Sequence, residues 1–306
     1  MSKLHWVALG TVSGVGGATA RALVERFGDI EAAFDASDEE LLAVPRVTPK
    51  VLAGLRAVSL DALETEMMSL SEEDIQVVTW DDEEYPANLR LIKSGAPGPP
   101  LLFVRGEFRL EDDQAVAVVG TRQPSACALA LAENLARELA ERGLTIVSGL
   151  AIGIDTAAHG GALQADDGRT LAVLGSGLRA IHPRGNIALA EEIVGRGALL
   201  SECFPDVLPR GSNLMARDRI TSGLSRAVIV VEAGEESGSV DTANKAARQG
   251  RLVLVVPGSP GTEALLAQGA ERLDPQSTDF DRLSQQIREV SLSDGGSSVD
   301  AQLPLL

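Results

Sequence analysis

From about residue 115 onward the sequence repeats one pattern: a short apolar run, a turn that contains glycine, and an amphipathic stretch. The apolar runs cover residues 115–119, 145–148, 170–174, 198–201, 227–231 and 252–256. Such alternation predicts an α/β fold with a doubly wound parallel sheet of the extended Rossmann type. Right-handed crossovers then bring the glycine turns together at the carboxyl ends of the strands, which is where these folds bind ligands.

The rest of the chain divides into three further parts. Residues 1–60 predict a small all-helical domain, whose Gly14-Val15-Gly16 turn resembles a helix-hairpin-helix. That turn either offers N–H groups to a phosphate or belongs to a plain helical packing module. Residues 61–110 predict a bridging segment with two strands that packs on the Rossmann-type domain of residues 111–276. Residues 277–306 predict one short helix and a disordered tail without a winged helix.

Composition excludes several classes of protein. No run of eighteen apolar residues and no signal peptide is present, so we expect a cytoplasmic protein with no membrane contact. The three histidines do not cluster, and Cys127 and Cys203 are far apart, so we expect no metal site, no cofactor and two buried, reduced thiols.

Charge gives a mixed indication about polyanions. The net charge of −17 repels them. One stretch is nevertheless rich in arginine, the residue best suited to phosphate; its members are Arg179, Arg184, Arg196, Arg210, Arg217, Arg219 and Arg226. These side chains either line a binding groove or are ordinary solvated or salt-bridged arginines.

Three turns at the predicted ligand edge contain groups suited to an anion. Gly120-Thr121-Arg122 follows the first strand and precedes a helix, so glycine, N–H groups and a fixed positive charge coincide there. Gly149 follows the second strand, and Ser237-Gly238 opens a later helix. Without a G-x-G-x-x-G fingerprint, this pattern does not indicate a dinucleotide.

Two pairs of residues in this region allow alternative interpretations. Asp155 and His159 are either an acid–base pair or, as we favour, a helix cap and a packed histidine. Arg217 and Arg219 hold successive phosphates if their segment is extended. If it is helical they diverge, and one of them is structural.

At this point the sequence resembles the bacterial DNA processing protein A family (DprA or Smf), from about residue 10 to about residue 270. The most specific motifs are Val118-Val119-Gly120-Thr121-Arg122, Ser148-Gly149-Leu150-Ala151, Arg217-Asp218-Arg219-Ile220, Ser237-Gly238-Ser239 and Pro257-Gly258. The resemblance implies a non-enzymatic protein that binds single-stranded DNA, forms a homodimer and loads the RecA recombinase during natural transformation. A single-stranded-DNA-binding protein is a further candidate partner.

The resemblance and the turns together give a predicted set of site residues. For single-stranded DNA these are Gly120, Thr121, Arg122, Gly149, Arg184, Asn213, Arg217, Arg219, Ser237 and Gly238. For the dimer interface they are Leu265, Leu266 and Leu273, near the last strand. No catalytic residue is predicted.

The chain departs from the family pattern at several positions. Asp218 stands where asparagine is usual between the two arginines, His182 replaces a common tyrosine, and Glu235-Glu236 precede the serine-glycine turn. The net charge and Asp218 favour one alternative, a nucleotide-sensing scaffold that no longer binds DNA. A second alternative is an enzyme like the phosphoribohydrolases, but Leu265 occupies the position of their catalytic glutamate. The final residues, 302–306, are loosely like clamp-docking motifs and are interpreted as an incidental apolar terminus.

Overall fold

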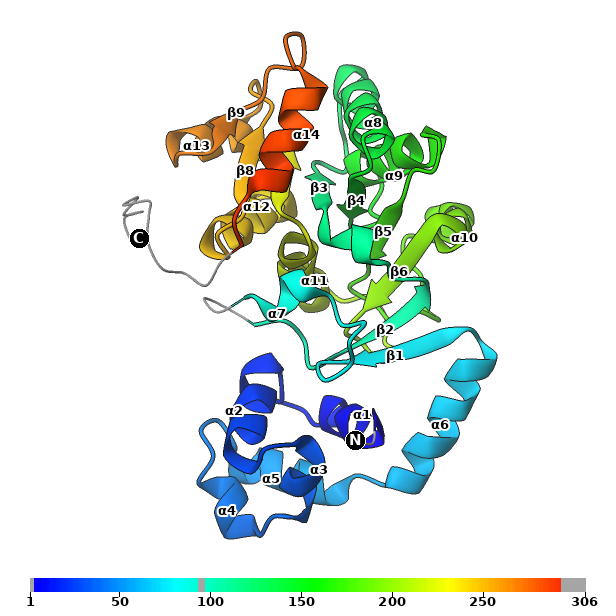
Figure 1. The fold of residues 1–306 in the computed structure, drawn as a ribbon, viewed down its shortest axis with the longest axis vertical. Coiled ribbons are helices and arrows are strands. Elements are labelled where there is room, and N and C mark those ends of the chain that lie inside the picture. The colour runs from blue at the N-terminus through cyan, green and yellow to red at the C-terminus, as the bar shows by residue number, and fades with distance from the viewer. Residues whose placement is uncertain (1–2, 93–96, 293–306) are drawn as a thin grey trace.

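The computed structural model describes residues 3–92 and 97–292. Its centre is a sheet of nine strands in the order β1-β2-β6-β5-β4-β3-β7-β8-β9 (Figure 1). The strands are β1 (Ile75–Thr79), β2 (Leu101–Gly106), β3 (Ala115–Val119), β4 (Thr145–Ser148), β5 (Thr170–Val173), β6 (Gly197–Ser201), β7 (Ala227–Val230), β8 (Leu252–Val255) and β9 (Glu271–Arg272).

The seven strands from β3 to β9 pair in parallel, which confirms the predicted Rossmann-type sheet. The chain winds outward from β3 through β4, β5 and β6, then returns to the other side of β3 for β7 and β8. This reversal makes the carboxyl ends of β3 and β7 the topological switch point, where such folds have a crevice. Strands β3 to β7 are buried along their whole length, as expected for a sheet covered on both faces.

The bridging segment contributes more to the sheet than the sequence predicted. Strands β1 and β2 pair antiparallel with each other, and β2 pairs antiparallel with β6 through Phe103 opposite Ser201. Residues 61–110 therefore extend the sheet through main-chain hydrogen bonds and do not simply pack against it. This segment also contains a helix that the sequence pattern did not reveal, α6 (Leu60–Glu72).

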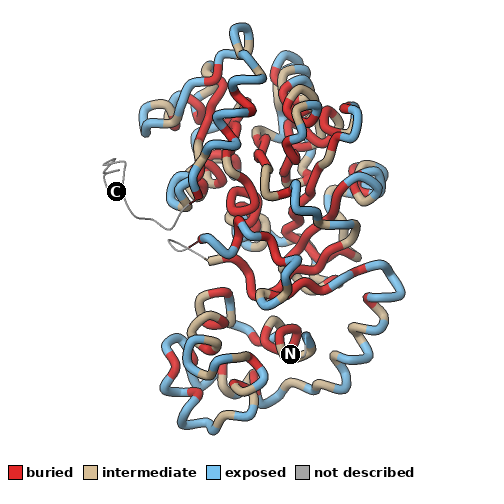
Figure 2. The backbone as a smooth tube through the Cα atoms, in the orientation of Figure 1, coloured by how far each residue is buried: buried red, intermediate tan, exposed pale blue. Residues whose placement is uncertain are grey.

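Helices cover both faces of the sheet. One face carries α8 (Ala126–Glu141), α9 (Ile154–Gln164), α10 (Ile187–Arg196) and α14 (Phe280–Glu289). The other carries α7 (Ala87–Arg90), α11 (Gly211–Leu224), α12 (Gly238–Arg248) and α13 (Pro260–Ala267). Short 3-10 turns η1 (Leu110–Asp113) and η2 (Arg184–Asn186) complete the domain. Figure 2 shows buried backbone running through the strands and the inward faces of these helices.

The N-terminal helices form a separate small core. They are α1 (Lys3–Thr11), α2 (Gly17–Phe27), α3 (Ile30–Asp35), α4 (Asp38–Leu42) and α5 (Pro49–Ala57). Helix α2 ends at Gly28, whose φ of 90° suits glycine. This domain lies beside the β1–β2 edge (Figure 1), and the Trp6 indole donates a 2.8 Å hydrogen bond to Asp81. Gly17, just after the predicted hairpin turn, packs so closely against the Gly98 carbonyl that a side chain there would collide with it.

Three smaller expectations have different outcomes. Cys127 is exposed in the first turn of α8, so the prediction of a buried thiol is wrong for this residue, while Cys203 is half-buried. Both are free thiols. The terminal motif at residues 302–306 lies outside the described residues. Within the part of the chain that the structure describes, no helix has both the length and the apolar character needed to cross a membrane.

Candidate functional site

A cavity of about 840 Å³ opens at the switch point, between the carboxyl ends of β3, β4 and β7 and the helices α11 and α12. We call this cavity the groove. It brings together seven of the ten residues predicted for DNA from three separate turns and one helix: Gly120, Thr121, Arg122, Gly149, Arg217, Ser237 and Gly238.

The loop after β3 is held against two neighbouring segments. The Thr121 N–H donates to the Glu232 carbonyl at 2.7 Å, and the Ile154 N–H donates to the Thr121 carbonyl at 3.2 Å. A Cβ on Gly120 would lie 2.6 Å from the Ile154 side chain, so glycine is required there. Arg122, by contrast, is exposed and makes no hydrogen bond or ion pair with any described residue. The loop is therefore rigid in its backbone while its cation stays available.

The start of α8 differs from the prediction. We expected its N–H groups to attract a ligand anion, but an internal carboxylate lies beside them. Glu232 accepts hydrogen bonds from the Ser125 hydroxyl at 2.7 Å and from the Ser125 N–H at 3.2 Å. The Ser125 hydroxyl in turn caps the helix by accepting from the Ala128 N–H. Because the Glu232 carboxylate already lies at the N-terminus of α8, an anion in the groove would be bound by Arg122 and Arg217 instead of by that helix.

Asp155 and His159 have structural roles, as favoured from the sequence, but the predicted helix cap at Asp155 is wrong, because the N-cap of α9 is Gly153 and has no side-chain cap hydrogen bond. The Asp155 carboxylate accepts from the N–H groups of Gly149 and Ala151 at 3.1 and 3.3 Å and so fixes the turn after β4. Burial raises the pKa of Asp155, against the attraction of Arg217. His159 is fully buried, with Nδ1 2.7 Å from the Thr170 hydroxyl, and burial lowers its pKa to about 3. It does not line the groove, so the two residues do not act as a pair there.

Arg217 forms the floor of the groove. Its guanidinium donates to the Val173 carbonyl at 2.5 Å and lies against Gly149, where any side chain would displace it. The side chain is 8 % exposed, and its Nε is 3.1 Å from the neighbouring Asp218 carboxylate. Burial raises the pKa of Asp218 to about 6, and this effect outweighs the attraction of Arg217.

The opposite wall of the groove is the N-terminus of α12. Ser237 caps this helix by accepting from the Val240 N–H, and its hydroxyl is 2.9 Å from that of Ser239. The same wall is strongly acidic, with Glu235 and Glu236 at the rim and Asp241 in the first helical turn. The groove therefore combines two cationic side chains with several carboxylates.

Three of the ten predicted DNA residues lie away from the groove: Arg219 and Asn213 on α11, and Arg184 after β5. Residues 211–224 are helical, and side chains two positions apart on a helix point in nearly opposite directions. Arg219 consequently leaves the groove and makes a two-pronged ion pair with Glu202, each N–O distance being 2.6 Å. Asn213 lies in the first turn of α11 and does not line the groove. Geometry therefore assigns Arg219 to holding α11 against the turn after β6.

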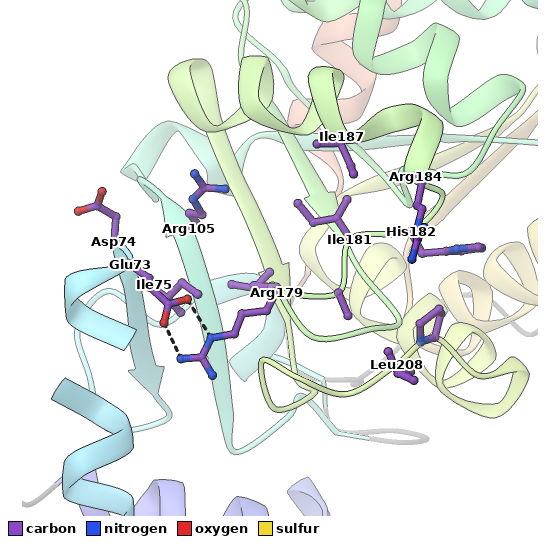
Figure 3. A pocket seen from close by; sticks show the side chains of 13 residues that line it. Glu73, Asp74, Ile75, Arg105, Arg179, Ile181, His182, Arg184, Ile187 and Leu208 are labelled. Carbon is purple, nitrogen blue, oxygen red and sulfur yellow. Dashed lines mark hydrogen bonds and ion pairs between the residues drawn. The ribbon is translucent and has the colours of Figure 1, made fainter. Parts of the chain in front are cut away.

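Arg184 lines a second cavity, of about 920 Å³, on the side of β5 away from β3 (Figure 3). At one side of this cavity Arg179 turns toward Glu73, with which it forms two hydrogen bonds of 2.6 and 2.8 Å. Arg184 and His182 lie at the other side, near Ile187. Arg184 makes no hydrogen bond or ion pair through its side chain with any described residue.

Most of the arginine-rich stretch is internally neutralised. Arg179 pairs with three carboxylates, Arg219 pairs with Glu202, and Arg196 and Arg226 donate to backbone carbonyls. The salt-bridged alternative is thus correct for Arg179 and Arg219, and Arg217 also pairs with Asp218. Within residues 3–92 and 97–292, the cations at the carboxyl edge that keep free guanidinium groups are Arg122, Arg184 and Arg210.

The predicted dimer residues are largely used within the chain. Leu265 and Leu273 are only 3 % and 6 % exposed and pack into the two cores on either face of the sheet. Leu266 is partly buried. A dimer at this edge would therefore need contacts beyond the side chains of Leu265 and Leu273.

Sequence reasoning missed two groove residues. Met215 lines the groove and is 54 % exposed. Thr221 also lines the groove, and its buried hydroxyl has no hydrogen-bond partner among the described residues. The sequence indicates Thr221 only through its position three residues after Asp218. In a helix this spacing places both residues on the same face, but it carries no information until the segment is known to be helical.

Comparison with known proteins gives matches over most of the chain. A family model described as DNA recombination-mediator protein A matches residues 76–285, and a SAM-like helix-hairpin-helix tandem model matches residues 7–56. DNA processing protein DprA of Bacillus subtilis is 38 % identical over 209 residues, which cover 66 % of this chain and 69 % of that protein.

Two solved structures are similar as well. DNA processing protein A of Streptococcus pneumoniae matches with a TM-score of 0.75 and 32 % identity, over 89 % of this chain and 95 % of that one. DNA processing protein A of Helicobacter pylori matches with a TM-score of 0.60 and 31 % identity, over 70 % and 96 %. The Helicobacter structure is described as giving insight into a unique single-stranded DNA binding mode.

Proposed function

Because this chain belongs to the DNA recombination-mediator protein A family, we propose that it binds single-stranded DNA in the groove and delivers it to a RecA-type recombinase. The observation that carries the proposal is the position of Arg122. This cation has no hydrogen-bond or ion-pair partner within residues 3–92 and 97–292, and it lies on a rigid loop at the switch point of the sheet. A free guanidinium can bind a phosphate in two-pronged fashion without first breaking another ion pair.

The same groove offers further groups for a nucleic-acid backbone. Arg217 contributes positive charge from the floor, and the first N–H groups of α12 open onto the cavity around Gly238. We propose that Gly120, Thr121 and Gly149 serve by letting the backbone approach closely. Arg184, in the second cavity, extends the proposed contact along the carboxyl edge.

We propose a binding role and no catalytic role. The position that would carry a glutamate in phosphoribohydrolases is Leu265, a buried core residue. The acid wall of the groove favours the competing scaffold function, in which DNA does not bind at all. We also propose homodimer formation and contacts with RecA or a single-stranded-DNA-binding protein, and the resemblance to the family supports this part of the proposal.

Titration of fluorescein-labelled oligo(dT) with purified protein at low salt tests DNA binding. We expect Arg122→Glu to weaken binding at least tenfold, because it replaces an attraction to phosphate by a repulsion. Arg282→Glu on α14 is the matched control, since it makes the same charge change at an exposed site on a helix that does not line the groove. Equal effects of the two variants, or no binding by the wild type, would reject the proposal.

Recombinase delivery needs a separate assay. RecA filament formation on oligo(dT) already covered by a single-stranded-DNA-binding protein should be accelerated by the wild-type protein and not by Arg122→Glu. Acceleration by neither would leave DNA binding in place and remove the delivery step.

A further inference from the structure

Two polar oxygens on one face of α11, Asp218 Oδ2 and Thr221 Oγ1, have no hydrogen-bond partner among the described residues although both side chains are buried at the groove. The Asp218 side chain is 10 % exposed, and only its Oδ1 is engaged, by Arg217. Its Oδ2 points toward Gly238 across the groove and accepts no hydrogen bond. One helical turn further, the Thr221 hydroxyl is buried and has no hydrogen-bond partner in the part of the chain that the structure describes. Buried groups of this kind cost free energy unless a ligand satisfies them.

The chemistry of these groups restricts what can bind them. An ionised carboxylate only accepts hydrogen bonds, so Asp218 Oδ2 needs a donor. Phosphate oxygens are negatively charged acceptors and are repelled at this point. The described residues contain no group of His, Cys, Asp or Glu side chains that could hold a metal ion, so a cation bridging Asp218 to phosphate has no built site. The group that binds here must therefore present N–H donors, and on a single strand of DNA the groups that do so are the nucleobases.

Resting on the proposed binding of single-stranded DNA, we propose that Asp218 and Thr221 form a subsite that reads a nucleobase and prefers guanine. The Watson–Crick edge of guanine carries adjacent N1–H and N2–H₂ donors, one for Asp218 Oδ2 and one for the Thr221 oxygen. Thymine presents one N–H between two carbonyl oxygens, which a carboxylate repels. Adenine and cytosine each present one amino group, so we expect their affinities to lie between those of guanine and thymine.

The position of the subsite fits a base whose phosphate lies on the cations. Asp218 directly follows Arg217 in the sequence, and the two side chains meet in the floor of the groove. Residues three apart on a helix have Cβ atoms about 5–6 Å apart, which is within the span of two donors on one base edge and their acceptors. Met215, exposed at the same cavity, supplies apolar surface for the face of the base.

The test compares labelled oligo(dT) with the same oligonucleotide carrying guanines at several positions, by fluorescence anisotropy at about pH 8, where Asp218 is ionised. We expect the wild type to bind the guanine-containing oligonucleotide about tenfold more tightly. Asp218→Asn should bind oligo(dT) more tightly, through loss of a negative charge, and lose the preference. Thr221→Val should reduce the preference, because it removes one of the two acceptor oxygens.

Glu236→Gln is the matched control, since it removes one negative charge from the rim and no buried oxygen. It should strengthen binding of both oligonucleotides equally. Equal wild-type affinity for the two oligonucleotides, or a preference that survives both Asp218→Asn and Thr221→Val, overturns the base-reading subsite. Failure of the wild type to bind either oligonucleotide overturns the proposed function itself, so the two failures are distinguishable.

Discussion

The buried carboxylate of Asp218 should make this protein less stable than it would be with a neutral side chain, and the effect should depend on pH. Burial raises its pKa from 3.8 to about 6 in the folded chain, even with Arg217 beside it. An acid whose pKa is raised on folding holds its proton more tightly in the folded state. The free energy of unfolding therefore falls as pH rises from about 4 to about 6, and stays lower above that.

The magnitude follows from the shift itself. One pKa unit corresponds to about 1.36 kcal/mol, so a rise from 3.8 to about 6 corresponds to about 3 kcal/mol of stability lost at neutral pH. Asp218→Asn keeps the shape and removes the charge. We expect this variant to be more stable than the wild type by up to about 3 kcal/mol at about pH 8 and by little at about pH 4.

Thermal unfolding of the two proteins across this pH range is the assay. At about pH 8 the variant should melt higher by up to roughly 5–10 °C, and the difference should shrink toward acid pH. Glu236→Gln, which removes an exposed charge, should change stability by less than about 0.5 kcal/mol at either pH. A difference between wild type and Asp218→Asn that is constant with pH, or a less stable variant at about pH 8, would refute the reasoning.

Three further predictions concern other contacts. Gly149→Ala should displace the Arg217 guanidinium and weaken oligo(dT) binding about tenfold in a folded protein, judged by circular dichroism; unchanged affinity would contradict the role of Arg217. Arg219→Ala should lower stability to urea by about 1–2 kcal/mol by leaving Glu202 unpaired, with oligo(dT) affinity nearly unchanged; a large loss of affinity would place Arg219 in the DNA site. Arg251→Met should lower the free energy of unfolding by about 3 kcal/mol in the same urea assay, because the buried guanidinium donates hydrogen bonds to the carbonyls of Asn88 and Gly223. An unchanged urea midpoint would argue against that role.

The sheet was predictable because its central strands are buried on both faces. Continuous apolar runs such as Ala115–Val119, each followed by a glycine turn, have few other interpretations. The two strands of the bridging segment were predicted, but their antiparallel pairing with each other and with β6 was not, because pairing between distant segments depends on which sheet edge is free after the parallel strands have assembled. Their partner, β6, lies almost a hundred residues away from β2.

The site residues whose role depends on backbone geometry were predictable from the sequence. Those whose role depends on side-chain partners were not. Gly120 and Gly149 are required by close approaches that a strand-turn-helix pattern implies. Arg217 and Arg219 look equivalent in sequence, yet they point to different sides of the helix α11. Arg217 therefore lines the groove, while Arg219 pairs with Glu202. Glu232, which lies beside the start of α8, carries no sequence signal for that contact with Ser125.

The salt dependence of oligo(dT) binding by the wild type and Arg122→Ala tests the groove most directly. Each phosphate neutralised on a single strand contributes about 0.7 to the slope of log affinity against log salt concentration. If Arg122 holds a phosphate in the groove, the variant should bind more weakly and its slope should be shallower by about 0.7. Parallel lines for the two proteins would show that DNA, if bound, does not contact Arg122, and would contradict the proposed site.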